Sequence, residues 1–206
     1  MKSIKITIID YDVGNVHSVY NAISKLGYKN INVSSNESQI KNSDCFILPG
    51  VGAFNKCIEN FKLNNLDNIL GEEVLVNKKP LLGICVGMQI LATYGTENGY
   101  CEGLDWIPGI VDKIELKKSF RIPHVGWNSI NLNSSKIFSR LEKEPDFYFD
   151  HSYSFRCDEK YVDAKCNYGS EIISAVSNGN IFGVQFHPEK SQNNGLKLFR
   201  GFFNNV

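Results

Sequence analysis

Hydrophobic positions in the first hundred residues form short apolar runs separated by stretches with helical spacing. Strands are predicted at 4–9, where apolar residues alternate with Lys5 and Thr7, and at the short segment 31–33. The continuously apolar runs 45–50 and 81–84 are typical of buried strands. Between the predicted strands, helical spacing occupies most of 54–78 and the segment 16–26, which ends beside Gly27, a residue suited to a helix C-terminus. This alternation predicts an α/β fold in three layers, with a mostly parallel central sheet and flanking helices.

The pattern changes after about residue 106, where short stretches rich in aromatic and β-branched residues follow one another. We expect them to be antiparallel strand additions to the same sheet, at 107–116, 125–132, 146–153, 171–177 and 181–186. The segment "GLKLFRGFF" predicts a closing helix with Leu196, Phe199 and Phe203 on one face. With 206 residues and no linker or repeat, residues 1–206 are expected to form a single domain.

Composition narrows the class of protein. The 22 basic and 22 acidic residues balance, so charge indicates neither a nucleic acid nor a membrane as partner. No signal peptide or membrane-length apolar run is present, and the six cysteines include no C-x-x-C pair. We therefore expect a cytoplasmic protein with reduced thiols and no metal site. The chain also lacks both G-x-G-x-x-G and the phosphate-binding P-loop pattern, so no cofactor is predicted.

Cys85 stands where a predicted strand becomes a predicted helix, within "GICVG". This G-x-C-x-G pattern is the cysteine version of the nucleophile elbow, in which a sharp corner projects the side chain out of the sheet. Free N–H groups at the start of the following helix favour a thiolate, and the Val86 N–H is placed to stabilise an oxyanion. The alternative is a small, inert core cysteine, because free cysteines are usually buried.

A thiol nucleophile needs a base, and His187 in "GVQFHPEKS" is the best candidate among four histidines. Pro188 restricts His187 to extended geometry, in which residues i and i+2 point to the same side. Glu189 could then orient one imidazole nitrogen while the other faces the sulfur, as in a catalytic triad. The remaining histidines are interpreted as a solvated helix residue (His17) and as structural or interface groups (His124 and His151).

Three motifs, "LPGVGAF", "PLLGICVGMQIL" and "GVQFHPE", resemble the class I (triad) glutamine amidotransferases in order and spacing. The segments "IDYDVGNVHSV", "RIPHVGWNSI" and "DHSYSF" are similar, more narrowly, to the glutaminase subunit of imidazole glycerol phosphate synthase. The resemblance implies hydrolysis of L-glutamine to glutamate and ammonia. It also implies a heterodimer in which a (β/α)₈-barrel synthase (cyclase) subunit uses the ammonia for histidine biosynthesis.

The same resemblance implies roles for individual residues. Cys85, His187 and Glu189 would be nucleophile, general acid–base and orienting carboxylate. The oxyanion hole would use Val86 with the loop around Val51 and Gly52. Substrate contacts would come from Gly50, Gly52, Gln89, Ser152 and Tyr153. The interface with the synthase would include Asn15, Arg121, His124, Trp127 and Asn128.

Departures from the family pattern lie on the partner-facing rim. Asp12 replaces a usual glycine, Asp150 a small apolar residue, and Arg121 a usual lysine, and Ser154 follows "HSY". They do not touch the triad, but they leave open which partner protein receives the ammonia. One alternative is the same glutaminase supplying a related barrel partner that amidates a bacterial surface sugar. Others are a cysteine peptidase or hydrolase on the same elbow, and a regulatory or redox subunit with an oxidisable Cys85.

Overall fold

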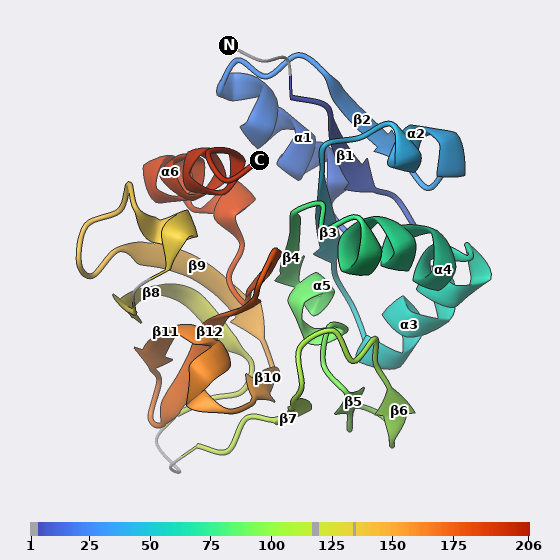
Figure 1. Cartoon of the computed structure of the whole chain (residues 1–206). Helices are drawn as coiled ribbons and strands as arrows, with labels where there is room; N and C mark the ends of the chain where they lie inside the picture. The colour runs from blue at the N-terminus through green and yellow to red at the C-terminus, as the bar shows by residue number, and fades with distance from the viewer. Residues whose placement is uncertain (1–3, 117–119, 134) are drawn as a thin grey trace.

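A long, twisted sheet runs through the computed structural model, which describes residues 4–116, 120–133 and 135–206. Over these residues its nine strands follow the order β2-β1-β3-β4-β13-β12-β11-β8-β9 (Figure 1). The parallel part consists of β1 (Ile6–Ile9), β2 (Ile31–Ser34), β3 (Cys45–Gly50), β4 (Leu81–Cys85) and β13 (Ile181–Val184). The antiparallel part consists of β12 (Glu171–Asn178), β11 (Val162–Asn167), β8 (His124–Leu132) and β9 (Asp146–His151). The predicted α/β fold is confirmed.

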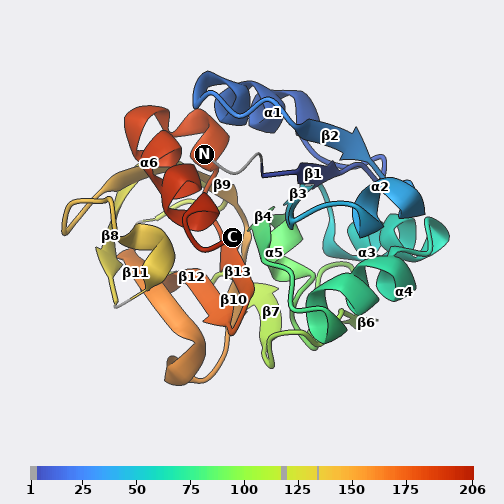
Figure 2. The ribbon, with the colours of Figure 1, turned by 45° about the horizontal axis from the view of Figure 1, so that its top comes forward.

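Helices cover both faces of the parallel strands and complete the three layers (Figure 2). One face carries α1 (Val16–Lys25) and α6 (Gln192–Phe203). The other carries α2 (Glu37–Lys41), α3 (Phe54–Leu63) and α4 (Leu66–Gly71), with a π-helical turn at Glu72–Val76. Short 3₁₀ turns occupy Lys136–Phe138, Glu159–Tyr161 and Pro188–Lys190. Because both faces are covered, every residue of β1, β3, β4 and β13 is buried, which explains why these strands are apolar apart from Thr7, whose hydroxyl is hydrogen-bonded to Ser43 Oγ.

Several expected elements differ from the structure. The predicted helical stretch 54–78 is divided, because Asn65 adopts a left-handed conformation (φ 55°) that ends α3 and starts α4. The predicted strand 181–186 is not a purely antiparallel addition, since β13 pairs in parallel with β4 and antiparallel with β12. Strand β11 and helix α2 were not predicted, because their short mixed sequences carry weak periodicity.

A second, smaller sheet also corrects the prediction that all late strands extend the main one. Over the described residues its order is β10-β7-β5-β6, formed by Tyr153–Arg156, Ile110–Lys113, Tyr94–Gly95 and Cys101–Glu102. The expected strand 146–153 breaks at Ser152, where the chain leaves β9 and enters β10. Strand β10 then pairs with β7, Tyr153 opposite Lys113, instead of with the main sheet. This transfer brings the 150–153 segment over the ends of the parallel strands.

Three adjacent parallel strands end at the same edge of the sheet. Gly50 at the end of β3 is in register with Cys85 at the end of β4. On the other side of β4, Ile84 is in register with Val184 of β13. Chain segments 50–52, 85–89 and 185–189 therefore meet at the carboxyl edge, the usual position of sites in open α/β sheets.

Candidate active site

Cys85 occupies a strained corner at the end of β4. Its backbone has φ 55° and ψ −114°, a conformation that a non-glycine residue rarely adopts. The flanking glycines permit close packing of the corner: a Cβ on Gly83 would lie 2.6 Å from the carbonyl oxygen of Gly87. A Cβ on Gly87 would overlap the carbonyl of Leu48 in β3. The spacing G-x-C-x-G thus follows from steric limits on both sides of the thiol.

The helix after Cys85 is shorter than the sequence suggested. Helix α5 covers only Val86–Gln89, one turn, and the chain then continues through turns. A single turn has a small macrodipole, so any effect on the sulfur comes from the N–H groups next to it. The local N–H groups at the corner remain.

His187 and Glu189 form a buried pair at the end of β13. His187 Nδ1 lies 2.8 Å from Glu189 Oε1, and both side chains are nearly inaccessible to solvent. His187 is extended (φ −102°, ψ 94°), as Pro188 predicts. However, the two residues are not successive positions of one extended strand, because Pro188–Lys190 form a 3₁₀ turn that carries the carboxylate back to the ring.

Backbone and side-chain hydrogen bonds fix His187 against strand β9. Its N–H donates to the carbonyl of Tyr148 at 2.8 Å, and its own carbonyl accepts from Ser191 Oγ at 2.6 Å. Ser191 Oγ also accepts from the Tyr148 N–H at 3.0 Å. The imidazole therefore has little positional freedom.

The electrostatic surroundings of His187 favour the charged ring. Burial by itself lowers its pKa, but hydrogen bonds to Cys85 and Glu189, and their negative charges, raise the pKa to about 10. His187 is therefore an imidazolium at neutral pH. The sulfur of Cys85 is thus one of the groups that keep the proton on the His187 ring.

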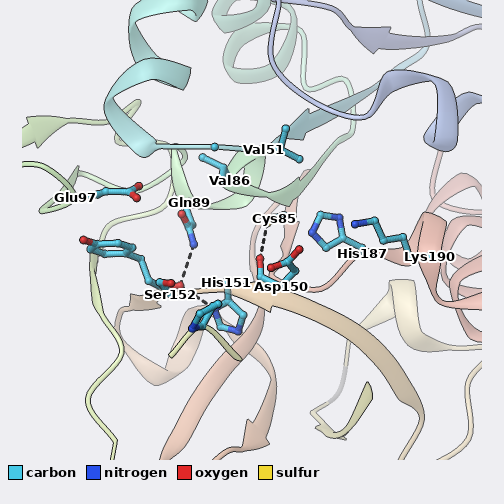
Figure 3. Close-up of a pocket in the computed structure, with 13 residues that line it drawn as sticks. Val51, Cys85, Val86, Gln89, Glu97, Asp150, His151, Ser152, His187 and Lys190 are labelled. Carbon is cyan, nitrogen blue, oxygen red and sulfur yellow. Dashed lines mark hydrogen bonds between the residues drawn. The ribbon is translucent and has the colours of Figure 1, made fainter. Parts of the chain in front are cut away.

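Cys85 and His187 line a pocket of about 280 Å³ (Figure 3). Cys85 and His187 lie toward one end, and Glu97 lies at the other with Gln89 between them. The lining residues are Val51, Gly52, Cys85, Val86, Gln89, Glu97, Pro123, Asp150, His151, Ser152, Tyr153, His187 and Lys190. The pocket thus combines a nucleophile, an acid–base group and polar contacts in a space suited to a small polar molecule.

The loop after β3 lies over the thiol. Val51 and Gly52 line the pocket, whereas Gly50, predicted to contact substrate, is buried in strand β3 and does not line it. The Val51 carbonyl accepts a hydrogen bond from Cys57 Sγ on α3 at 3.7 Å. Since carbonyl and following N–H point in opposite directions across a trans peptide, the Gly52 N–H points away from α3.

Five residues that line the pocket were not among the site residues predicted from the sequence: Glu97, Pro123, Asp150, His151 and Lys190. Glu97 Oε2 accepts from the Phe54 N–H at 2.8 Å, which fixes its carboxylate at the start of α3. Glu97 lies in a turn region without any local pattern that marks a functional acid. Lys190, by contrast, directly follows Glu189 in the chain, and this proximity to the predicted triad could have indicated it.

His124 does not lie on the surface, which corrects its assignment to a partner interface. In β8 the side chains alternate, so Val125 and Trp127 are exposed while His124 is only 2% exposed. His124 Nδ1 lies 3.0 Å from His151 Nε2, and its ring stacks on Phe149. Burial lowers the pKa of His124 to about 4 and that of His151 to about 3. Both rings are therefore neutral.

The other predicted interface residues occupy different places. Trp127 is 50% exposed, and Arg121 is exposed. Asn128 is partly buried and donates to the carbonyl of Asn167 at 3.1 Å. Asn15 caps α1 by accepting from the Ser18 N–H at 3.3 Å. Of these, Trp127 is the large apolar side chain most accessible to a partner.

Comparisons with known proteins match nearly the whole chain. The family model described as "Glutamine amidotransferase class-I" matches residues 7–206. Imidazole glycerol phosphate synthase subunit HisH 2 of Vibrio vulnificus (strain YJ016) is 48% identical, covering 96% of this chain and 93% of that protein. The corresponding HisH of Pelagibacter ubique (strain HTCC1062) is 44% identical, covering 97% of this chain and 99% of that protein.

Solved structures agree with the architecture. A crystal structure of a glutamine amidotransferase superposes with a TM-score of 0.75 at 17% identity, covering 96% of this chain and 97% of that one. The structure of PurLQS from Thermotoga maritima gives a TM-score of 0.73 at 19% identity, covering 98% of both chains. At these identities the likeness shows the fold alone.

Proposed function

Because the chain belongs to the class I glutamine amidotransferase family, we propose that it is the glutaminase subunit of an imidazole glycerol phosphate synthase. In this role it hydrolyses L-glutamine to L-glutamate and supplies ammonia for histidine biosynthesis. The observation that carries the proposal is the Cys85 corner beside the His187–Glu189 pair, in one small polar pocket. Relatives named as HisH subunits, at 39–48% identity over nearly the whole chain, support the choice of synthase.

The first half of the reaction forms a thioester. The Cys85 thiolate attacks the carboxamide carbon of glutamine, and the carbonyl oxygen becomes an oxyanion. The His187 imidazolium then gives its proton to the departing nitrogen, so ammonia leaves as the C–N bond breaks. Glu189 orients the ring through the 2.8 Å contact at Nδ1, leaving Nε2 for the reacting atoms.

The second half releases glutamate. Neutral His187 takes a proton from water, whose oxygen attacks the thioester carbon. The C–S bond breaks, glutamate leaves, and the thiolate–imidazolium pair is restored. Both halves pass through an oxyanion, so the same donors serve each of them.

We assign the oxyanion donors to the N–H groups of Val86 and Gly52. Val86 directly follows the nucleophile. Gly52 is preferred over Val51 because the Val51 carbonyl accepts from Cys57, which turns the Gly52 N–H away from α3. Removing one such donor in comparable sites costs about 3 kcal/mol of transition-state stabilisation.

The far end of the pocket suits the amino-acid group of glutamine. The Glu97 carboxylate, fixed by the Phe54 N–H, can pair with the α-ammonium group. Ser152 and Tyr153, where the chain passes between the two sheets, offer polar groups for the α-carboxylate. Gln89 lies between the two ends.

A barrel-shaped synthase subunit is proposed as the partner in a heterodimer. Free ammonia at neutral pH is mostly protonated, so a receiving subunit that covers the pocket mouth would preserve its reactivity. Exposed apolar residues lie on the pocket lining and on strand β8: Val51 of the lining is 41% exposed, and Val125 and Trp127 of β8 are 51% and 50% exposed. Val125 lies opposite the pocket residue Asp150 in the β8–β9 ladder. Such a patch is typical of a protein interface.

We further infer that residues 1–206 form one domain, since the main sheet contains strands from both halves of the chain. A cytoplasmic location is proposed because the described cysteines are free thiols, the usual state of cysteine in that compartment. None of the described helices is long and apolar enough to cross a membrane.

The test is a glutaminase assay with and without the barrel synthase subunit, on the wild type and on Cys85→Ala. We expect wild-type activity in the complex and a loss of several orders of magnitude in Cys85→Ala, because triad members act as a unit. Glu189→Gln should lose less, since it orients the base and leaves the nucleophile. Unchanged activity in Cys85→Ala would refute the mechanism. Failure to restore growth of a histidine auxotroph, with glutaminase activity intact, would refute the histidine assignment.

A further inference from the structure

Gln185 is the residue of β13's extension that lies next to the nucleophile. Because Val184 is in register with Ile84, the following residues on each chain, Gln185 and Cys85, are neighbours. Gln185 Nε2 lies 3.8 Å from Cys85 Sγ, and the side chain is completely buried. At its other end, Gln185 Oε1 accepts from Gln89 Nε2 at 3.0 Å. One buried amide therefore joins the nucleophile to a pocket residue.

The backbone carbonyl of Tyr153 determines which way the side-chain amides of Gln89 and Gln185 are turned. The Tyr153 carbonyl can only accept, so Gln89 must present its NH₂ group there, at 3.0 Å. His151 Nδ1 must also donate to this carbonyl, at 2.8 Å, so Nε2 of the neutral ring accepts from His124. The second hydrogen of Gln89 Nε2 then meets Gln185 Oε1, which leaves Gln185 Nε2 facing the sulfur.

These hydrogen bonds determine which groups Gln89 can offer to the substrate and Gln185 to the sulfur. Both hydrogens of Gln89 Nε2 are used inside the protein, and no described residue donates to its Oε1. Gln89 lines the pocket, so its Oε1 is an acceptor for an N–H of the substrate. At the other end, an N–H directed at a thiolate is a charge-assisted hydrogen bond.

We propose that Gln185 is a positioning residue of the glutaminase reaction, which both stabilises the Cys85 thiolate and fixes the Gln89 amide with its oxygen toward glutamine. The inference rests on the proposed function for its second part. The first part concerns the sulfur alone and can be measured without substrate.

The test compares Gln185→Met, which keeps the shape of the side chain but neither hydrogen bond, with the wild type in the complete complex. The pH profile of Cys85 alkylation by iodoacetamide should shift to higher pH. The value of kcat/KM for glutamine should fall by about 10- to 100-fold, the usual effect of losing a hydrogen bond to a charged group. KM should rise, because Gln89 then keeps only its hydrogen bond to the Tyr153 carbonyl and its amide is held less firmly against the substrate.

Asn180→Met is a matched control at the opposite end of β13. The Asn180 amide donates to the carbonyls of Val74 and Lys79 at 2.9 and 2.8 Å, far along the strand from the thiol. Its loss should lower thermal stability without moving the alkylation profile or KM. If Gln185→Met does not fold, Gln185→Asn, too short to bridge both partners, should give the same changes to a smaller extent.

An alkylation profile and KM equal to those of the wild type, in a folded Gln185 variant, would overturn the inference and leave a purely structural amide. The proposed function fails in a different way. In that case the wild-type complex hydrolyses no glutamine, while the shift in Cys85 alkylation between wild type and Gln185→Met still reports the contact with the sulfur.

Discussion

The protonation of His187 depends on two partners that come from different segments. Burial would lower its pKa, and the value of about 10 arises from the hydrogen bonds and charges of Cys85 and Glu189. The ring is thus charged because the corner at residue 85 lies beside it. At the scale of single residues, the charge of the base therefore depends on the nucleophile as well as on its carboxylate partner.

Replacing Cys85 by alanine should therefore change the titration of His187. We expect its pKa to fall below the wild-type value of about 10, because Cys85 is the largest of the contributions that raise it. NMR titration of the histidine ring resonances measures this directly. A pKa that stays the same in Cys85→Ala would mean that the sulfur and the ring do not interact in solution.

At the scale of elements, close approach between backbone segments forms the corner. Strand β4 turns into α5 directly against β3, so the space at the glycines of "GICVG" is limited by main-chain carbonyls. A main-chain carbonyl cannot move aside as a flexible side chain can. These two positions therefore accept only glycine, which has no Cβ.

Gly87→Ala should destabilise the protein by about 3 kcal/mol, because the new methyl group overlaps the Leu48 carbonyl. Gly71→Ala is the matched control. Gly71 has helical dihedrals, and an added Cβ would lie 3.9 Å from its nearest neighbour, Trp106. Alanine there should stabilise the protein by roughly 0.5–1 kcal/mol. Urea unfolding curves measure both, and equal stability of the two variants would contradict the steric explanation.

At the scale of the whole molecule, the buried histidines make stability depend on pH in two directions. His124 and His151 have pKa values lowered by burial to about 4 and about 3, against an ordinary 6.5. The two neutral rings contribute fully to the free energy of unfolding above pH 6.5, and this contribution is lost as the pH falls toward these values. His187 has a raised pKa, so its contribution is complete below 6.5 and is lost as pH rises through about 10. For these three groups, stability is greatest near neutral pH.

The acid side can be tested with His124→Gln, which removes one titrating ring. Between about pH 6.5 and pH 4, both rings of the wild type should bind a proton when the protein unfolds, whereas in the variant only His151 should do so. The free energy of unfolding in urea, measured across this range, gives the slope for each protein. Identical slopes would show that His124 is charged in the folded state or does not titrate differently on unfolding.

Much of the fold and the candidate triad could be predicted from local patterns. Continuous apolar runs identified β3 and β4, because strands buried on both faces have no polar side to display. The glycines around Cys85 indicated a corner, and Pro188 indicated extended geometry at His187, since both effects act within a few residues. The sequence by itself thus determined the chemistry of the residues and the local conformations that present them.

Only the tertiary structure decided which of these residues meet. The register of β13 against β4 places Gln185 beside Cys85, 100 residues away along the chain. The alternation in β8 buries His124 and exposes Trp127, and the transfer of the chain into a second sheet closes the pocket at 150–153. Contacts between distant segments depend on strand order and register, which hydrophobic periodicity within one segment does not specify.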